Sequence, residues 1–163
     1  MSLSKKQIKI QEKMLNPFKF GVFKILKLPL AYLAGIKLTA LTKENSVATV
    51  KYKYLNTNPF KSMYFAVLAM TAELTTGALA LFSIAKHDQS IAVLVVSSKG
   101  TFLKKAIGEI RFECKNGLDF KNKIATCVQS NEAVEVTAKS IGYNSNDEIV
   151  CEYEFTWSFK VRS

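Results

Sequence analysis

The spacing of hydrophobic positions changes several times along the chain, and its first forty residues favour helices. An imperfect 3.6-residue pattern predicts a helix over residues 6–15, and a second helix is expected over residues 17–33. In the second helix, apolar and basic side chains are expected on separate faces, with Phe20 and Phe23 apolar and Lys24 and Lys27 basic. Residues 1–40 therefore form a helical N-terminal extension, and a short strand is expected at residues 37–41.

Most of the remaining chain alternates in the manner of strands. Strands are expected where β-branched and aromatic residues alternate with polar ones, at residues 47–54, 91–102, 107–114, 133–143 and 148–161. In the last of these, every second residue from Ile149 to Phe159 is hydrophobic, which gives the strand one apolar face. Asp119 is expected to cap a short helix, because Phe120, Ile124 and Val128 recur every four residues.

The longest helical segment, residues 63–84, is apolar on nearly every side. A helix of this kind must be buried on all sides. Its length would allow it to cross a membrane, but Glu73 and neighbouring threonines interrupt its middle. A strongly curved antiparallel sheet wrapped around it, with a second copy of the chain covering the rest, would bury the helix. The predicted fold class is α+β, in a single domain of residues 1–163 that forms a dimer.

Composition agrees with one packed domain and restricts its chemistry. The 163 residues are 48% hydrophobic and include only 7 Gly and 3 Pro, which excludes disorder and fibrous repeats. The single histidine, His87, lies in a polar loop sequence, so most hydrolases that need an imidazole base are excluded. The three cysteines form no C-x-x-C pair, which argues against a disulfide framework and a zinc site. We therefore expect no metal and a reducing, cytoplasmic setting.

The net charge of +10 comes entirely from the first part of the chain. Residues 1–61 hold 12 lysines and 2 glutamates, whereas residues 62–163 hold 11 basic and 11 acidic side chains. Base readout in nucleic acids favours arginine, so no nucleic acid is expected as a partner. Lysines interleaved with apolar residues suit a basic amphipathic surface. Peripheral membrane contact through these helices is the weaker alternative to their packing on the domain.

One residue, Glu73, is anomalous because it lies in the middle of the most apolar segment. Burial of an ionised carboxylate is costly unless polar partners compensate for the lost hydration. Glu73 must therefore have polar neighbours, become protonated or face a cleft. A functional carboxylate satisfies this condition, and so does one that only hydrogen-bonds a neighbouring threonine or the N-terminus of another element.

Asn58 and Glu73 are 15 residues apart, in a loop and on the helix that follows it, and this arrangement resembles the hotdog-fold thioesterases. The similarity is to the small single-domain type related to phenylacetyl-CoA thioesterases. It covers residues 45–161, with Glu73 in the stretch TAELTTG. Residues 98–108 are similar to the passage that follows the central helix in these enzymes. The resemblance implies a curved antiparallel sheet around a long central helix, in a homodimer or a dimer of dimers.

The resemblance also implies hydrolysis of acyl-CoA thioesters without a cofactor, since coenzyme A belongs to the substrate. Glu73 would act as general base or nucleophile, and Asn58 would orient the water or the carbonyl. The backbone N–H of Phe65 would stabilise the oxyanion. Because hotdog sites usually lie between subunits, Asn58 and Glu73 would act from different chains. The side chains expected to contact substrate are those of Tyr64, Thr76, Lys99, Lys104 and Lys105.

The chain departs from the family pattern at the mouth of the helix. Where many members carry His-Gly-Gly, this sequence has Tyr64-Phe65-Ala66. Leu94 replaces a hydroxyl residue that helps to hold the nucleophile in some relatives. Bulkier side chains at the mouth would narrow the site. The first alternative is therefore a non-catalytic hotdog module that binds an acyl chain or an acyl thioester. A third interpretation is a membrane-surface or nucleic-acid adaptor built on the N-terminal helices.

Overall fold

The computed structural model describes residues 3–162 of the chain, which have an α+β structure: three helices come first, and six strands follow in pairs with α-helices between the pairs. The elements in chain order are α1 (Lys5–Leu15), α2 (Pro17–Lys27), α3 (Pro29–Ala34), β1 (Lys37–Leu41), β2 (Ser46–Lys51), the 3-10 turn η1 (Tyr54–Asn56), α4 (Phe65–Ile84), β3 (Ile91–Phe102), β4 (Glu109–Cys114), α5 (Gly117–Ser130), β5 (Val134–Tyr143) and β6 (Ile149–Val161).

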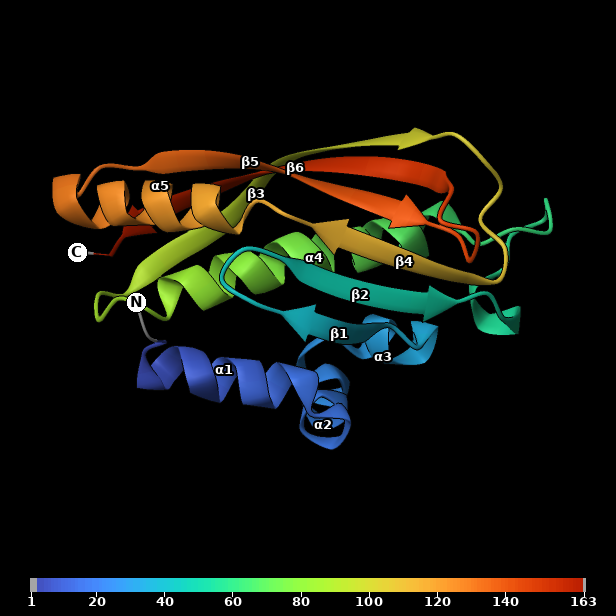
Figure 1. Cartoon of the computed structure of the whole chain (residues 1–163), viewed down its shortest axis with the longest axis horizontal. Coiled ribbons are helices and arrows are strands. Elements are labelled where there is room, and N and C mark those ends of the chain that lie inside the picture. The colour runs from blue at the N-terminus through green and yellow to red at the C-terminus, as the bar shows by residue number, and fades with distance from the viewer. Residues whose placement is uncertain (1–2, 163) are drawn as a thin grey trace.

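The six strands form one antiparallel sheet in the order β1-β2-β4-β5-β6-β3. Figure 1 shows this sheet extending along α4, with α1, α2 and α3 gathered on one side of the molecule and α5 on the other. The helix α4 contacts five of the strands, but β3 lies beyond them at the edge of the sheet and pairs only with β6. The predicted architecture, an antiparallel sheet around a long central helix with helices before it, is confirmed.

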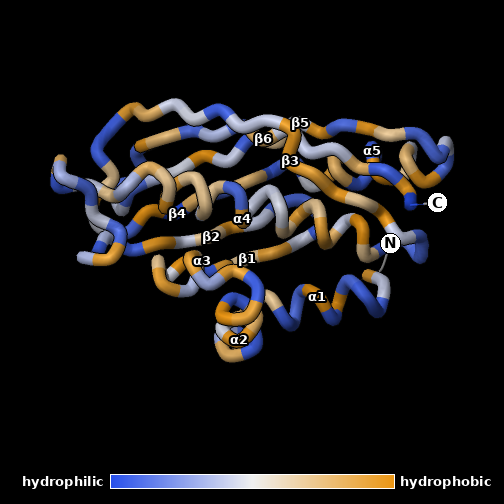
Figure 2. Tube along the Cα trace, turned by 180° about the vertical axis from the view of Figure 1, so that it is seen from behind, coloured by the Kyte–Doolittle hydropathy of each residue, from blue (hydrophilic) through white to orange (hydrophobic). Residues whose placement is uncertain are grey.

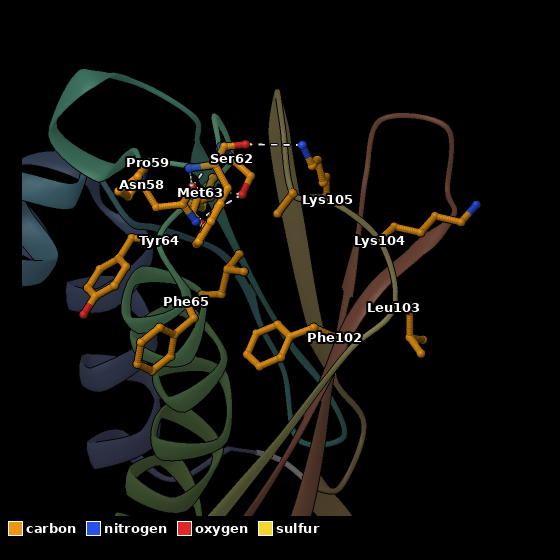
Figure 3. Close-up of a pocket in the computed structure, with 13 residues that line it drawn as sticks. Asn58, Pro59, Ser62, Met63, Tyr64, Phe65, Phe102, Leu103, Lys104 and Lys105 are labelled. Atoms are coloured by element: carbon orange, nitrogen blue, oxygen red, sulfur yellow. Dashed lines mark hydrogen bonds between the residues drawn. The ribbon is translucent and has the colours of Figure 1, made fainter.

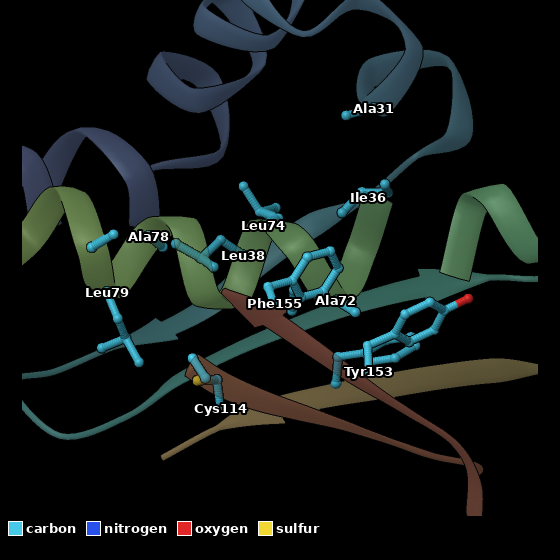
Figure 4. Close-up of a cluster of buried hydrophobic side chains, with 14 of the residues drawn as sticks. Ala31, Ile36, Leu38, Ala72, Leu74, Ala78, Leu79, Cys114, Tyr153 and Phe155 are labelled. Carbon is cyan, nitrogen blue, oxygen red and sulfur yellow. The ribbon is translucent and has the colours of Figure 1, made fainter. Parts of the chain in front are cut away.

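The core forms between α4 and the inner face of the sheet, where large side chains such as Phe112 and Phe159 are fully buried. Figure 4 shows Leu74 and Leu79 of α4 in one cluster with Phe155 of β6. As the sequence pattern predicts, alternate residues of β6 from Cys151 to Phe159 are buried.

The polar side chains of α4 are satisfied within the core. The Thr71 hydroxyl donates to the Val67 carbonyl oxygen at 2.7 Å, and Thr75 donates to the Ala72 carbonyl oxygen at 2.7 Å. These bonds let threonine lie in an apolar helix without an unpaired hydroxyl. By length and composition alone α4 could cross a membrane, but core helices of globular proteins pass the same test, and α4 is the core helix here.

The N-terminal segment differs from the prediction in two respects. The helix expected over residues 17–33 is divided at Leu28, because Pro29 disfavours a helical conformation in the residue before it and Leu28 takes φ −139° and ψ 57°. Lys24 does not lie on an exposed basic face: it is buried, and its Nζ donates to the Ile36 carbonyl oxygen at 2.6 Å. Burial lowers the pKa of Lys24.

Two other element boundaries differ from the prediction by three residues. The strand β2 ends at Lys51 rather than at residue 54, because the chain turns into η1. The helix α5 begins at Gly117, and its N-cap position is Asn116 rather than Asp119. Asp119 lies in the first turn, where its carboxylate accepts a hydrogen bond from Asn116 Nδ2 at 2.7 Å.

Gly117 lies where two backbone segments meet closely, and a Cβ atom there would be 2.2 Å from the Lys43 carbonyl oxygen. We expect Gly117→Ala to destabilise the protein by about 1–3 kcal/mol, because the backbone must move to admit the methyl group. Chemical unfolding measures this change. The matched control is Gly21→Ala in α2, where a Cβ meets nothing within 4 Å and helix propensity favours alanine. Equal stability of both variants would contradict the prediction.

Candidate functional site

A cavity of about 700 Å³ opens at the N-terminal end of α4. The loop before α4 and the segment after β3 form its walls. Figure 3 shows the rings of Phe65 and Phe102 near each other on opposite sides, and the Lys104 side chain directed away from them. The residues that line the cavity are Asn58, Pro59, Phe60, Ser62, Met63, Tyr64, Phe65, Leu68, Phe102, Leu103, Lys104, Lys105 and Ala106.

The N-terminus of α4 is uncapped and points a free donor group towards this end of the molecule. Tyr64 occupies the N-cap position without a side-chain hydrogen bond, and the first turn holds no acidic residue. Within residues 3–162, neither the Phe65 N–H nor the Ala66 N–H has a hydrogen-bond partner. Unpaired N–H groups at the positive end of a 20-residue helix favour a negative charge.

Aromatic rings surround this helix end. The Phe65 ring lies 4.9 Å from the Tyr64 ring and 6.5 Å from the Phe102 ring, both in edge-on arrangements. The Tyr153 hydroxyl donates to the Phe65 carbonyl oxygen at 3.1 Å, and its ring packs on Phe102 at 5.8 Å. These contacts fix the first turn of α4 against β6, so the Phe65 N–H is held in one position.

Asn58 holds the loop that leads into α4. Its Oδ1 accepts from the N–H groups of Phe60 at 2.9 Å and Ser62 at 3.2 Å. Its Nδ2 donates to Ser62 Oγ at 3.1 Å and to the Met63 carbonyl oxygen at 3.4 Å. Both ends of the amide are therefore engaged within the loop, which makes Asn58 a positioning residue for the cavity wall in the single chain.

Glu73 lies in a second cavity, of about 290 Å³, between α4 and the junction of α2 with α3. Its carboxylate has no hydrogen bond or ion pair with any group in the described part of the chain. Burial alone raises the pKa of Glu73, since no nearby charge offsets it. The carboxylate folds back along the helix, where its Oε1 would be 3.2 Å from a Cβ at Gly77.

The second cavity contains residues that the sequence did not indicate. It is lined by Lys27, Leu28, Pro29, Leu30, Ala31, Met70, Glu73 and Leu74. The pattern of residues 17–33 predicts one continuous helix, and such a helix would not offer the bend that forms this wall. The pre-proline residue Leu28 was the one signal in the sequence for that bend.

The structure brings some of the predicted site residues together and separates others. Asn58, Tyr64, Phe65, Lys104 and Lys105 line the first cavity. Glu73 lies eight residues along α4 from Phe65, which is about 12 Å at the helical rise, and lines only the second cavity. Within one chain, the carboxylate and the free N–H group therefore do not meet.

Thr76 and Lys99 line neither cavity. Thr76 is buried against β6, where its Oγ1 donates to the Glu73 carbonyl oxygen at 3.0 Å and accepts from Trp157 Nε1 at 3.1 Å. A ligand cannot reach this hydroxyl, so the predicted contact of Thr76 with substrate is not supported by its position. Lys99 is exposed on β3, opposite Glu154 of β6.

The lysines of the first cavity have protein partners. Lys104 forms an ion pair with Glu148, and Lys105 Nζ donates to the Phe60 carbonyl oxygen at 3.3 Å. Both side chains are exposed, so these contacts are weak enough to exchange for an anionic ligand.

The groups associated with other chemistries lie elsewhere. His87 is in the loop after α4, and its N–H donates to the Ile84 carbonyl oxygen at 2.9 Å. The three cysteines are buried, and burial raises the pKa of Cys114 to about 11 and that of Cys151 to about 12. Such thiols are poor nucleophiles at neutral pH. Residues 3–162 contain no group of three or more His, Cys, Asp or Glu side chains placed to hold a metal ion.

Searches with the sequence found neither a matching protein-family model nor a significant match among curated proteins. Solved structures do match the fold. A Pseudomonas aeruginosa protein of unknown function, described as a "probable thioesterase", superposes with a TM-score of 0.74 at 19% identity, over 92% of this chain and 99% of that one. A Haemophilus influenzae thioesterase superposes with a TM-score of 0.65 at 11% identity, over 93% of this chain and 95% of that one.

A third structure, a single-residue variant of another Pseudomonas aeruginosa thioesterase, superposes with a TM-score of 0.66 at 11% identity, over 94% of this chain and 99% of that one. The expectation of a hotdog fold is confirmed by these superpositions. They extend beyond residues 45–161, so the shared architecture includes much of the segment that the sequence resemblance left out.

Proposed function

We propose that this hotdog-fold protein hydrolyses acyl-CoA thioesters as a homodimer. The observation that carries the proposal is Glu73, a carboxylate without a partner in the described chain, which lines a cavity on an otherwise uncharged helix. A buried carboxylate without a partner lowers the stability of the fold. Carboxylates with a perturbed pKa are frequent at functional sites. The fold is shared with solved proteins named as thioesterases, which supports the reaction class.

The chemistry follows from the groups present. Glu73 either takes a proton from water as the water attacks the thioester carbonyl, or attacks that carbonyl itself to form an anhydride that water then cleaves. In both routes the acyl C–S bond breaks, and the products are a carboxylic acid and a thiol. The free N–H groups of Phe65 and Ala66 would donate to the oxyanion that forms at the carbonyl.

A shared site explains why these groups lie apart in one chain. Reacting atoms must approach to about 3–3.5 Å, far less than the roughly 12 Å along α4 that separates Phe65 from Glu73. A second copy of the chain would bring its own carboxylate to the helix mouth of the first. Asn58 would then support the loop at that mouth, while Glu73 acts from the other subunit.

The edge strand β3 is suited to this association. Its outer edge, along a strand of 12 residues, has no strand partner in the described chain, and Lys99 is its one charged residue. Long edges with few charges pair readily with another strand. Val93 and Val95 stand opposite Phe159 and Trp157, on the face that carries α4. Val93 is partly buried against the core, but Val95 stays 37% exposed, and a partner's helix would cover it.

Coenzyme A carries phosphates that a basic rim would attract. Lys104 and Lys105 line the cavity at the helix mouth, and Lys99 lies on β3 near the proposed seam. Electrostatic steering by such lysines raises the rate of encounter with an anionic substrate. We therefore assign the nucleotide end of the substrate to this side and the acyl group to the apolar walls.

Release of free thiol from short, medium, long and aromatic acyl-CoA thioesters tests the proposal. We expect release from at least one class, measured with a thiol reagent. The protein's own thiols are buried and will not contribute to the signal. An absence of release from every class, with the protein folded and dimeric, would contradict hydrolysis.

The second candidate function is binding of an acyl chain or acyl thioester without catalysis. It is favoured by the aromatic cluster of Tyr64, Phe65 and Phe102 at the helix mouth, where side chains occupy space that a substrate carbonyl needs. Saturable acyl-CoA binding without thiol release would identify this function.

A further inference from the structure

The outward face of α2 is hydrophobic, which is the reverse of an ordinary surface helix. Phe18, Val22, Ile25 and Leu26 are spaced as i, i+4, i+7 and i+8 and are all exposed, Phe18 to 80% and Leu26 to 71%. The buried side of the same helix carries Phe20. A helix packed on a domain normally turns polar residues to water. This apolar stripe therefore has no partner within the described chain.

The exposed apolar surface continues into α3. Its small residues Ala31 and Ala34 face inward, whereas Leu30, Tyr32 and Leu33 are exposed, Leu30 to 66%. Figure 1 shows α2 and α3 next to each other on the side of the molecule away from α5, and Figure 2 shows α2 projecting below the remaining elements. The two helices thus present one hydrophobic projection, which we name the α2–α3 face and define by residues 18–33. Patches of this kind mark interaction sites.

The charges around the α2–α3 face are positive with one exception, Glu12 on α1. Exposed lysines lie on α1 and α2, and residues 13–43 include no acidic residue. These exposed lysines are Lys5, Lys6, Lys9, Lys13, Lys19 and Lys27. Lys6 is paired with Asp88, but the others leave a positive rim beside the hydrophobic stripe. The partner of this surface must therefore be apolar at its centre and negatively charged around it.

A second copy of the chain does not meet this requirement. In a two-fold dimer the same patch meets itself, so the lysines of one copy would face those of the other with only Glu12 to offset them. The edge of β3 carries one lysine, Lys99, so the penalty is smaller there and this edge is the better surface for association between copies. The α2–α3 face and the edge of β3 thus call for different partners.

We propose that the α2–α3 face binds an anionic lipid membrane surface. The apolar side chains of α2 and α3 would enter the boundary between headgroups and acyl chains, while the flanking lysines contact acidic headgroups. Both helices would lie in the plane of the membrane–water interface without crossing the membrane. The inference rests on the exposed residues of α2 and α3 and is independent of any hydrolytic activity.

Co-sedimentation with vesicles tests the inference on the full chain. We expect binding to phosphatidylcholine vesicles that contain about 30% phosphatidylserine, and release of the protein in about 1 M salt, where charge interactions are screened. Pure phosphatidylcholine vesicles should bind at least about tenfold more weakly, because each lysine near an anionic surface contributes roughly fivefold. Equal binding to both vesicle types, or to neither, would overturn the proposal.

A pair of double variants locates the contact. Phe18→Ser with Leu26→Ser removes two large apolar groups from the stripe, and we expect vesicle binding to weaken at least about tenfold. The control is Ile107→Ser with Leu118→Ser, which makes the same kind of change at two exposed residues elsewhere and should bind as the native chain does. Circular dichroism and the unfolding midpoint confirm that both variants are folded. Unchanged vesicle binding by the Phe18→Ser, Leu26→Ser variant would overturn the proposal. It would also be overturned if the native chain did not bind vesicles and this variant formed a smaller oligomer than the native chain.

Discussion

The Glu73→Gln variant is expected to hydrolyse acyl-CoA thioesters at least about a hundredfold more slowly than the native protein. Glutamine has nearly the shape of glutamate but can neither accept a proton from water nor act as a carboxylate nucleophile. Thiol release under saturating substrate measures the effect. The matched control is Glu12→Gln on α1, an exposed glutamate remote from both cavities, which should leave the rate unchanged. Native turnover in the Glu73 variant would remove this residue from the mechanism.

The raised pKa of Glu73 gives this prediction a pH dependence. The reaction needs the ionised carboxylate, so the native rate should fall as the pH is lowered through the raised pKa, above the range of an ordinary glutamate. The effect of pH on the stability of the fold runs in the opposite direction. Because the folded pKa lies above the unfolded one, the penalty of the buried charge is absent below the unfolded pKa and complete above the folded pKa. Glu73→Gln should therefore stabilise the protein at neutral pH and lose this gain in acid.

The Phe65→Pro variant is expected to lower hydrolysis by about 10²–10³-fold, because it removes the N–H group proposed to meet the oxyanion. Proline suits the site: Phe65 is the first residue of α4, and Tyr64 before it has φ −63° and ψ 132°, a conformation that a following proline accepts. The control is Phe65→Ala, which removes the same ring but keeps the N–H. If both variants lose activity equally, the ring matters and the N–H does not.

The two inactive variants also test whether the site is shared. Heterodimers of Phe65→Pro with Glu73→Gln, purified after co-expression with two tags, contain one site that combines an intact helix mouth with an intact carboxylate. We expect about half of the native activity per dimer, since one of two sites is complete. Heterodimers as inactive as the parent variants would show that each site uses groups of a single chain, or that association occurs through another surface.

The sequence predicts the elements well where periodicity and burial agree. The alternation in β6 and the apolar run of α4 both reflect a single environment along a whole element, and the structure has them within two residues of their expected bounds. The prediction is poorer where one residue decides the geometry. At Leu28 the conformation before a proline breaks a pattern that otherwise reads as one helix, and a periodic pattern carries no information about such a break.

The candidate site could be predicted only in part, because its residues meet through tertiary contacts. The spacing of Asn58 and Glu73 in the sequence does not reveal that the Asn58 amide is engaged by its own loop. Thr76 is one turn from Glu73 but faces Trp157 in the core, since neighbouring helix positions can point to different surroundings. Lys24 is similar: its charge suggests exposure, yet it is buried and its Nζ donates a hydrogen bond to the Ile36 carbonyl oxygen.

The position of α4 in the chain has a consequence for synthesis. Of the strands that enclose this helix, β1 and β2 precede it, but β4, β5 and β6 follow it. A ribosome must therefore complete residues 134–161 before the sheet can close around α4, and until then the side of this 20-residue apolar helix that faces β4, β5 and β6 is left uncovered. The yield of folded protein is thus set by how well the nascent chain is shielded from aggregation during that interval.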